Sequence, residues 1–119
     1  MKLRFWLTGQ ALTAVVAIAP ISAMAGTIAY VGGGLLSGSV EACLKNMKTA
    51  GDKNGFTESQ ETIMSDNKKE GDFHADHKDS PMHFTGSCAP NAGVWSIGVS
   101  GIDNDKTFEM YGKVWKAIP

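Results

Sequence analysis

The stretch MHFTGSCAPNAGVWSIGVS at residues 82–100 decides the fold of this chain. Apolar or small residues alternate with polar ones on both sides of the sequence PNAG at residues 90–93. A period of two places one set of residues on one face of a strand, and a turn between two such runs predicts an antiparallel hairpin. His83 is then expected on the solvent face. The residues expected on the core face are Met82, Phe84, Gly86, Cys88, Trp95, Ile97 and Val99.

A helix is predicted downstream of this hairpin. Residues 101–105 break the second strand, and Asp105 can cap a helix that follows. The side chains that then recur at the spacing of one helix face are Phe108, Tyr111, Trp115 and Ile118. We expect this face in the core, although Trp95, Tyr111 and Trp115 could instead line a ligand pocket.

Another helix is predicted upstream of the hairpin, over about residues 39–50. Ser39 is a good N-cap, and Gly51 is a plausible stop after the last turn. Apolar residues recur between them at helical spacing. This buried stripe is formed by Val40, Cys43, Leu44 and Met47.

Two shorter strands complete the pattern. Residues 27–31 are β-prone and are expected to end at the glycines of residues 32–34, and residues 56–64 give a weak strand signal. The predicted order is β-α-β-β-β-α. Half-apolar strands favour an antiparallel sheet. We therefore predict one small α+β domain over residues 26–119, with two helices packed on one face of the sheet.

Cys43 and Cys88 allow a single disulfide. Both are expected to point into the core, one from the first helix and one from the hairpin. In an oxidising compartment an even number of cysteines indicates a bridge. It would close a loop of 46 residues, for which chain entropy gives about 4 kcal/mol of stability. The alternative is two free buried thiols.

Residues 1–25 are typical of a cleaved secretory signal peptide. Lys2 and Arg4 precede an uncharged apolar run at residues 11–21, and small residues follow up to Ala25. An uncleaved anchor is the alternative, but about 11 apolar residues are fewer than the roughly 20 that span a bilayer. We expect cleavage between Ala25 and Gly26, a periplasmic or secreted protein, and no membrane attachment afterwards.

The remaining chain is slightly acidic. Residues 26–119 contain 9 Lys and no Arg against 12 Asp and Glu, which gives a net charge of −3. Binding to a phosphate backbone requires a basic surface. The composition therefore argues against a nucleic-acid partner.

All three histidines lie within the polar stretch at residues 65–83. Its residues 65–81 are expected to form a long loop or a solvated hairpin tip, and His83 on the strand that follows can face this loop. Neutral imidazoles bind Zn²⁺ or Cu²⁺, and a nearby carboxylate can complete or orient such a site. The candidate metal ligands are His74, His77, His83 and Asp76. Two alternatives stay open, namely a loop that contacts some other partner and a plain solvated loop.

Two further chemistries receive less support. The glycine-rich segment at residues 30–39 resembles an anion cradle before a helix, but it lacks the Lys of a phosphate-binding loop. Ser80 or Ser87 could pair with His83 as a nucleophile and base, but no catalytic framework surrounds them. The sequence therefore predicts a small exported, non-enzymatic binding or accessory protein, whose partner could be another exported protein. The loop at 65–83 is the expected contact, and transition-metal binding is the alternative.

Overall fold

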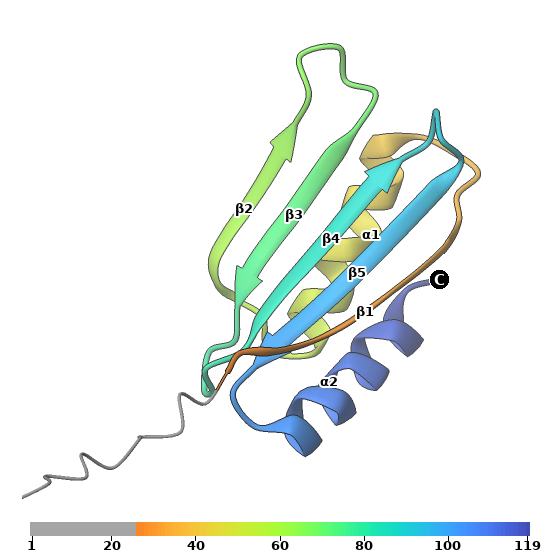
Figure 1. Cartoon of the computed structure of the whole chain (residues 1–119). Coiled ribbons are helices and arrows are strands. Elements are labelled where there is room, and N and C mark those ends of the chain that lie inside the picture. Colours follow the sequence, from red (N-terminus) through yellow and green to blue (C-terminus); the bar gives the residue numbers. More distant parts are fainter. Residues whose placement is uncertain (1–25) are drawn as a thin grey trace, which may run out of the picture.

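A computed structural model describes residues 26–119, which form a five-stranded antiparallel sheet and two helices (Figure 1). The strand order in the sheet is β1-β5-β4-β3-β2. The predicted fold class is confirmed, namely an antiparallel sheet with two helices on one face, and the sheet contains one strand more than the predicted order β-α-β-β-β-α. The predicted signal peptide lies outside the described residues and stays a prediction. The elements are β1 (Ile28–Leu35), α1 (Val40–Lys53), β2 (Glu58–Met64), β3 (Gly71–Asp76), β4 (His83–Ala89), β5 (Val94–Gly101) and α2 (Asn104–Ala117).

The hairpin at residues 82–100 forms as expected. Strands β4 and β5 pair with Phe84 opposite Val99 and with Cys88 opposite Trp95. Both strands alternate between buried and more exposed residues along most of their length. The hairpin therefore forms the centre of the sheet, and one of its faces supplies much of the core.

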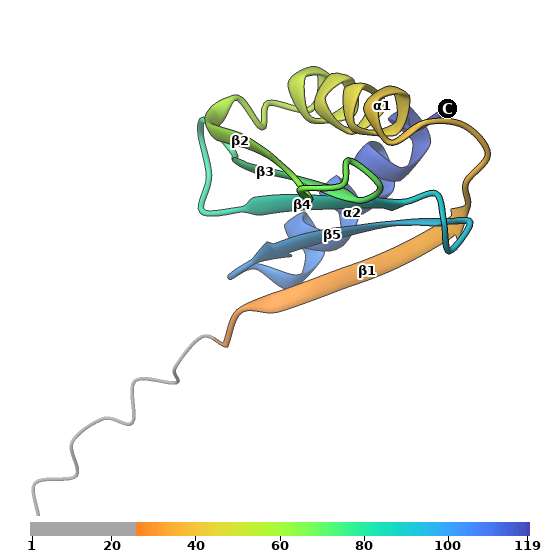
Figure 2. The same cartoon turned by 90° about the horizontal axis from the view of Figure 1, so that it is seen from above.

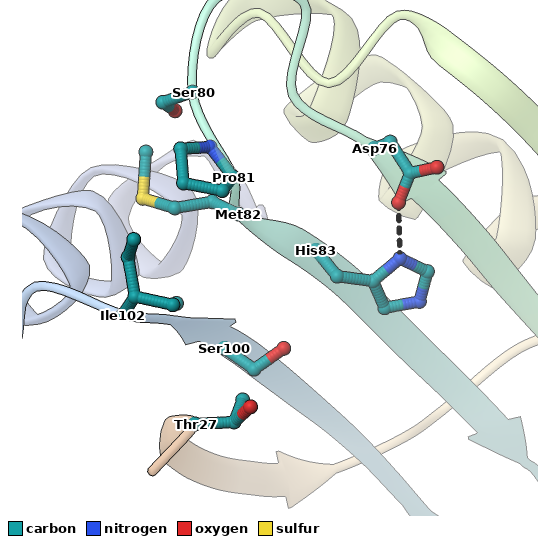
Figure 3. Close-up of a pocket in the computed structure, with 9 residues that line it drawn as sticks. Thr27, Asp76, Ser80, Pro81, Met82, His83, Ser100 and Ile102 are labelled. Carbon is teal, nitrogen blue, oxygen red and sulfur yellow. Dashed lines mark hydrogen bonds and ion pairs between the residues drawn. The ribbon is translucent and has the colours of Figure 1, made fainter. Parts of the chain in front are cut away.

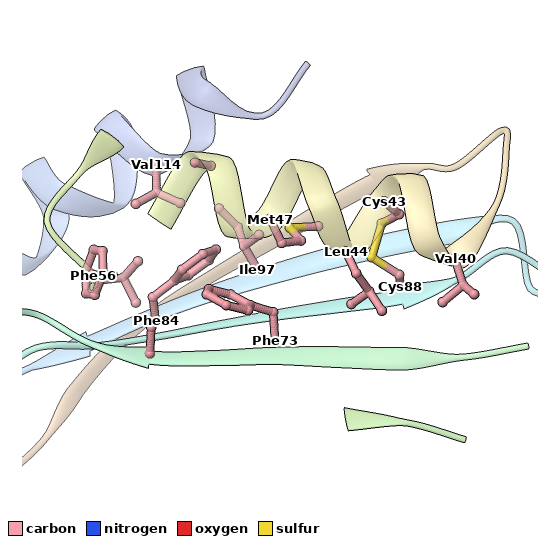
Figure 4. Packing of buried hydrophobic residues seen from close by; sticks show 13 residues of the cluster. Val40, Cys43, Leu44, Met47, Phe56, Phe73, Phe84, Cys88, Ile97 and Val114 are labelled. Carbon is pink, nitrogen blue, oxygen red and sulfur yellow. A yellow bond between two sulfur atoms is a disulfide. The ribbon is translucent and has the colours of Figure 1, made fainter. Parts of the chain in front are cut away.

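Both helices pack on the same face of the sheet. Helix α1 lies over β3 and β4, whereas α2 lies over β5 and β1 and also contacts α1 (Figure 2). Figure 4 shows the buried side chains between these two layers. The buried hydrophobic residues are Val40, Cys43, Leu44, Met47, Ala50, Phe56, Phe73, Ala75, Phe84, Cys88, Ile97, Val99 and Val114.

The predicted disulfide joins the helix layer to the sheet layer. Cys43 of α1 and Cys88 of β4 are bonded, and their Cα atoms lie 6.1 Å apart. Such a separation is ordinary for a disulfide. Both side chains are buried, so the bond belongs to the core and not to the surface.

The inward face of α2 differs from the prediction. Phe108 is 59% exposed and Trp115 is 38% exposed, while Thr107 and Val114 are fully buried. Thr107 can approach the sheet closely because Gly101 opposite it has no side chain. Asp103 caps the helix in place of Asp105, and its carboxylate accepts a hydrogen bond from the Lys106 amide.

Two predicted boundaries were wrong because glycines continue the elements instead of ending them. Strand β1 runs through residues 32–34, where pairing with β5 stabilises the backbone. Helix α1 runs past Gly51, whose lack of a side chain lets Phe73 and Phe84 pack closely against the helix. The backbone turns only after Asn54, at Gly55, where φ is +82°.

The prediction of a loop over residues 65–83 was also wrong, since β3 lies within it. Gly71, Phe73 and Ala75 point into the core in alternation. Only Phe73 among them is a large apolar residue, so the alternation of apolar and polar residues that predicts a strand could not be recognised in the sequence. The stretch is therefore a turn at residues 65–70, a strand, and a second turn at residues 77–82.

Candidate functional site

The face of the sheet opposite the helices carries a row of short polar side chains. Alternation along β3, β4 and β5 directs these residues away from the core, because their neighbours point into it. We call this set the polar face. It consists of Asp72, His74, Asp76, His83, Thr85, Ser87, Ser96 and Ser100.

Side-chain contacts across β3 and β4 hold part of the polar face in place. Opposite residues in the strand register interact three times in succession, since Asp72 faces Ser87, His74 faces Thr85 and Asp76 faces His83. The Ser87 hydroxyl donates to Asp72 at 2.5 Å, and Thr85 Oγ1 lies 3.3 Å from His74 Nδ1. His83 Nδ1 lies 2.7 Å from the Asp76 carboxylate. These groups therefore have defined orientations.

His74 and His83 also lie against each other. Their ring centroids are 5.8 Å apart, and the ring planes differ by 26°. The two rings therefore lie next to each other, with the Asp76 carboxylate beside Nδ1 of His83 and the Thr85 hydroxyl beside Nδ1 of His74.

His77 lies apart from the other two histidines. Its ring packs edge-on against Phe56 with centroids 5.2 Å apart, and its Nδ1 accepts a hydrogen bond from the Asp79 amide. Ser80 Oγ is 2.9 Å from the same nitrogen. The turn after β3 directs His77 toward Gly55 and away from the polar face.

The four predicted metal ligands are thus only partly assembled. His74, His83 and Asp76 lie together, and His77 does not. Within residues 26–119, no three His, Cys, Asp or Glu side chains are placed to hold a metal ion. Zinc or copper binding stays a prediction from the sequence, and the geometry adds no support to it.

A hollow of about 290 Å³ lies at one end of the polar face (Figure 3). The Asp76–His83 pair forms one wall of it, and the other walls come from β5 and from the turn before β4. The hollow joins a polar pair to an apolar rim. That rim contains Pro81, Met82 and Ile102.

A second, shallow hollow of about 340 Å³ runs along the middle of the same face. Thr85, Ser87 and Ser96 line one part of it, while Ala29 and Val31 of β1 line the other. The open face of the sheet therefore changes from polar over β3 and β4 to small and apolar over β1.

The other candidates from the sequence are not assembled as sites. Most of the segment at residues 30–39 is strand, and the Ser39 hydroxyl caps α1 by accepting from the Ala42 amide. Ser87 pairs with Asp72 and Ser80 with His77, so neither serine contacts His83.

The aromatic residues expected in the core form a partly buried cluster, and a hollow of about 460 Å³ on α2 is lined in part by Phe108, Tyr111 and Trp115. The rings of Trp95 and Trp115 lie with centroids 5.1 Å apart, and Tyr111 lies 6.0 Å from Trp115. Gly32 and Gly34 of β1 accommodate these rings, because a side chain at either position would collide with them. The glycine-rich strand thus serves packing.

The serine and threonine part of the polar face has no functional role in the predictions from the sequence. The alternating pattern identifies Thr85, Ser87, Ser96 and Ser100 only as the polar half of two strands. A row of hydroxyls at every second position in adjacent strands was the available signal. These hydroxyls form one continuous surface only because β3, β4 and β5 are neighbours in the sheet.

Comparison with protein-family models, with curated proteins and with solved structures finds no match to this chain. Among residues 26–119, no helix combines the length and the apolar character required to cross a membrane.

The Asp76–His83 pair gives a pH-dependent prediction. The hydrogen bond from His83 lowers the pKa of the Asp76 carboxyl below that of an ordinary aspartate. The interaction stabilises the fold above the unfolded-state pKa, and this contribution is lost as the pH falls through the lower, folded-state pKa. We expect the Asp76 carboxyl ¹³C shift to titrate at a higher pH in His83→Ala than in the wild type.

The matched control for this titration is His77→Ala, which removes a histidine that lies apart from the Asp76 carboxylate. It should leave the Asp76 midpoint unchanged. Because 42% of the His83 side chain and 52% of the Asp76 side chain are exposed, the effect on overall stability should be small. Identical Asp76 midpoints in the wild type and in His83→Ala would show that the hydrogen bond has no electrostatic effect.

Proposed function

We propose that this chain is a small exported, non-enzymatic binding or accessory protein that contacts a partner protein through its polar face. The observation that carries the proposal is the row of fixed polar side chains on an open sheet face. Side chains that are already held by neighbours lose less conformational entropy when a partner binds. Asp72, His74 and His83 are oriented in this way.

The proposed location is the periplasm or the exterior of the cell. The buried Cys43–Cys88 bond is compatible with an oxidising compartment. The predicted signal peptide at residues 1–25 and its cleavage before Gly26 would provide the route. The acidic composition of residues 26–119 favours a partner with a complementary basic surface.

The proposed contact is narrower than the loop at residues 65–83 expected from the sequence. Within that stretch, the outward residues of β3 and the first residue of β4 belong to the polar face, whereas the turn at residues 65–70 lies beyond the strand ends. The proposed contact therefore centres on Asp72, His74, Asp76 and His83. It also includes Thr85, which lies opposite His74 on the same face.

Site-specific photo-crosslinking in the exporting cell tests this proposal. A photoreactive residue at Thr85 should give a discrete crosslinked product with a partner protein, because Thr85 lies at the centre of the polar face. The control position is Lys45, which is exposed on α1 on the other side of the molecule. The proposal requires a product at Thr85 that is absent at Lys45 and is lost when Asp72→Arg is added. No product at Thr85, or equal products at both positions, would refute it.

A further inference from the structure

The two edges of the sheet differ in how well they are protected against further strand pairing. At the β2 edge, the register shifts between Glu58 and Glu61, and Ser59 between them has a positive φ of 49°. Bulges and charged side chains are the usual means by which natural sheets block an edge. The β2 edge has both.

Strand β1 at the opposite edge has neither protection. It spans eight residues with the sequence IAYVGGGL, which contains no charged residue and no proline. Its pairing with β5 is continuous from Ile28 to Leu35, with no register shift. A long, regular and uncharged edge strand is a template for another strand.

The hydrogen-bond register shows which residues of β1 could bind that strand. The Leu36 amide donates to the Gly93 carbonyl at 2.8 Å, and hydrogen-bonded pairs alternate with non-bonded pairs in an antiparallel ladder. Tyr30, Gly32 and Gly34 therefore direct their backbone groups toward β5. The residues whose backbone N–H and C=O groups point out of the sheet edge are Ala29, Val31, Gly33 and Leu35.

The side chains of the same four residues lie on the open face of the sheet, so they do not block the approach of another strand to the edge. Gly33 has no side chain, and Val31 and Leu35 are 76% and 90% exposed. The Val31 and Leu35 side chains are therefore mostly exposed within their own chain, and covering them with apolar surface from a neighbouring chain would be favourable. The edge thus combines free backbone groups with unburied apolar side chains.

We propose that β1 pairs antiparallel with β1 of a second copy of this chain, which joins the two sheets across a two-fold axis. A second copy fits because β1 is uncharged. Two acidic domains can therefore meet at this edge without placing like charges opposite each other, which they could not do at the β2 edge. Such an interface is self-complementary, as a two-fold axis requires.

One register satisfies the outward groups of both copies. With the axis at residue 32, Ala29 lies opposite Leu35 and Val31 lies opposite Gly33 of the second copy. All four outward residues then face outward residues, and the apolar part of the open face becomes continuous across the junction. The interface is made largely of backbone hydrogen bonds, so we expect a dimer that dissociates on dilution.

Sedimentation equilibrium of the purified, untagged, oxidised protein over a range of micromolar concentrations tests the proposal. The wild type should show a concentration-dependent mass that approaches twice that of one chain. Val31→Pro removes an outward N–H and no bond to β5, and it should raise the dimer dissociation constant at least tenfold. Val31→Lys should do the same by placing like charges near the axis.

The matched control is Ile63→Lys, which adds the same charge to a half-exposed residue of β2 and should leave the dimer unchanged. Circular dichroism checks that each variant is folded. If Val31→Pro does not fold, the result for Val31→Lys tests the proposal. A monomer at all concentrations would overturn the proposal. So would a dimer that resists both Val31 variants, or a foreign strand found bound to β1. None of these outcomes bears on crosslinking at Thr85, so this inference and the proposed function fail separately.

Discussion

Replacing Cys43 and Cys88 together by alanine is expected to lower the free energy of unfolding by about 4 kcal/mol. The disulfide spans 45 positions in the sequence, and without it the unfolded chain regains the entropy of the open loop. Small domains have total stabilities of about 5–15 kcal/mol. The loss would therefore remove a large share of the stability, or unfold the domain near body temperature.

Urea denaturation followed by circular dichroism measures this loss. The matched control is the wild-type protein under reducing conditions, which should show the same decrease because it lacks the same bond. The free energy of unfolding of the double variant should be the same under oxidising and reducing conditions. A loss below about 1 kcal/mol would mean that the unfolded state stays compact without the disulfide, contrary to the chain-entropy argument.

Phe84→Ala is expected to cost about 3–5 kcal/mol. The Phe84 ring is fully buried in the centre of the core, and its centroid lies 5.6 Å from that of Phe56 and 5.7 Å from that of Phe73. Truncation leaves a cavity that these two rings cannot fill, because the disulfide-bonded α1 and the sheet hold them on both sides. Urea denaturation again gives the change.

The matched control for this truncation is Phe108→Ala. Phe108 was expected in the core from its helical spacing, but it is mostly exposed and contacts Tyr30 at a centroid distance of 5.0 Å. Its truncation should cost clearly less than that of Phe84, because most of the Phe108 side chain is exposed and the aromatic pair adds only about 0.5–1.5 kcal/mol beyond the buried area. Equal losses for the two variants would contradict the placement of α2 in the structure.

The central hairpin could be predicted because nearly every second residue in β4 and β5 marks a face. Strand β3 could not, since Gly71 and Ala75 are small and leave Phe73 as the only strong signal. Helical spacing placed Phe108 and Trp115 on one face of α2. It could not show that this helix lies near the edge of the sheet, where Thr107 and Val114 are its only fully buried residues.

The candidate site was predictable in part for a similar reason. The histidines and acidic residues at 65–83 were recognised as a cluster, but their partners depend on the register between β3 and β4. That register places His83 opposite Asp76 and His74 opposite Thr85. The direction of His77 depends on the turn after β3. No local pattern specifies either feature.

The position of the disulfide also affects how the molecule withstands proteolysis. The turn at residues 65–70 is largely exposed and polar, and such tips are preferred cleavage sites. Cys43 and Cys88 lie on either side of it in the sequence. A single cut in this turn would therefore leave two fragments that are still covalently joined, with α1 held against β4. The two fragments would therefore remain one molecule until the disulfide is reduced.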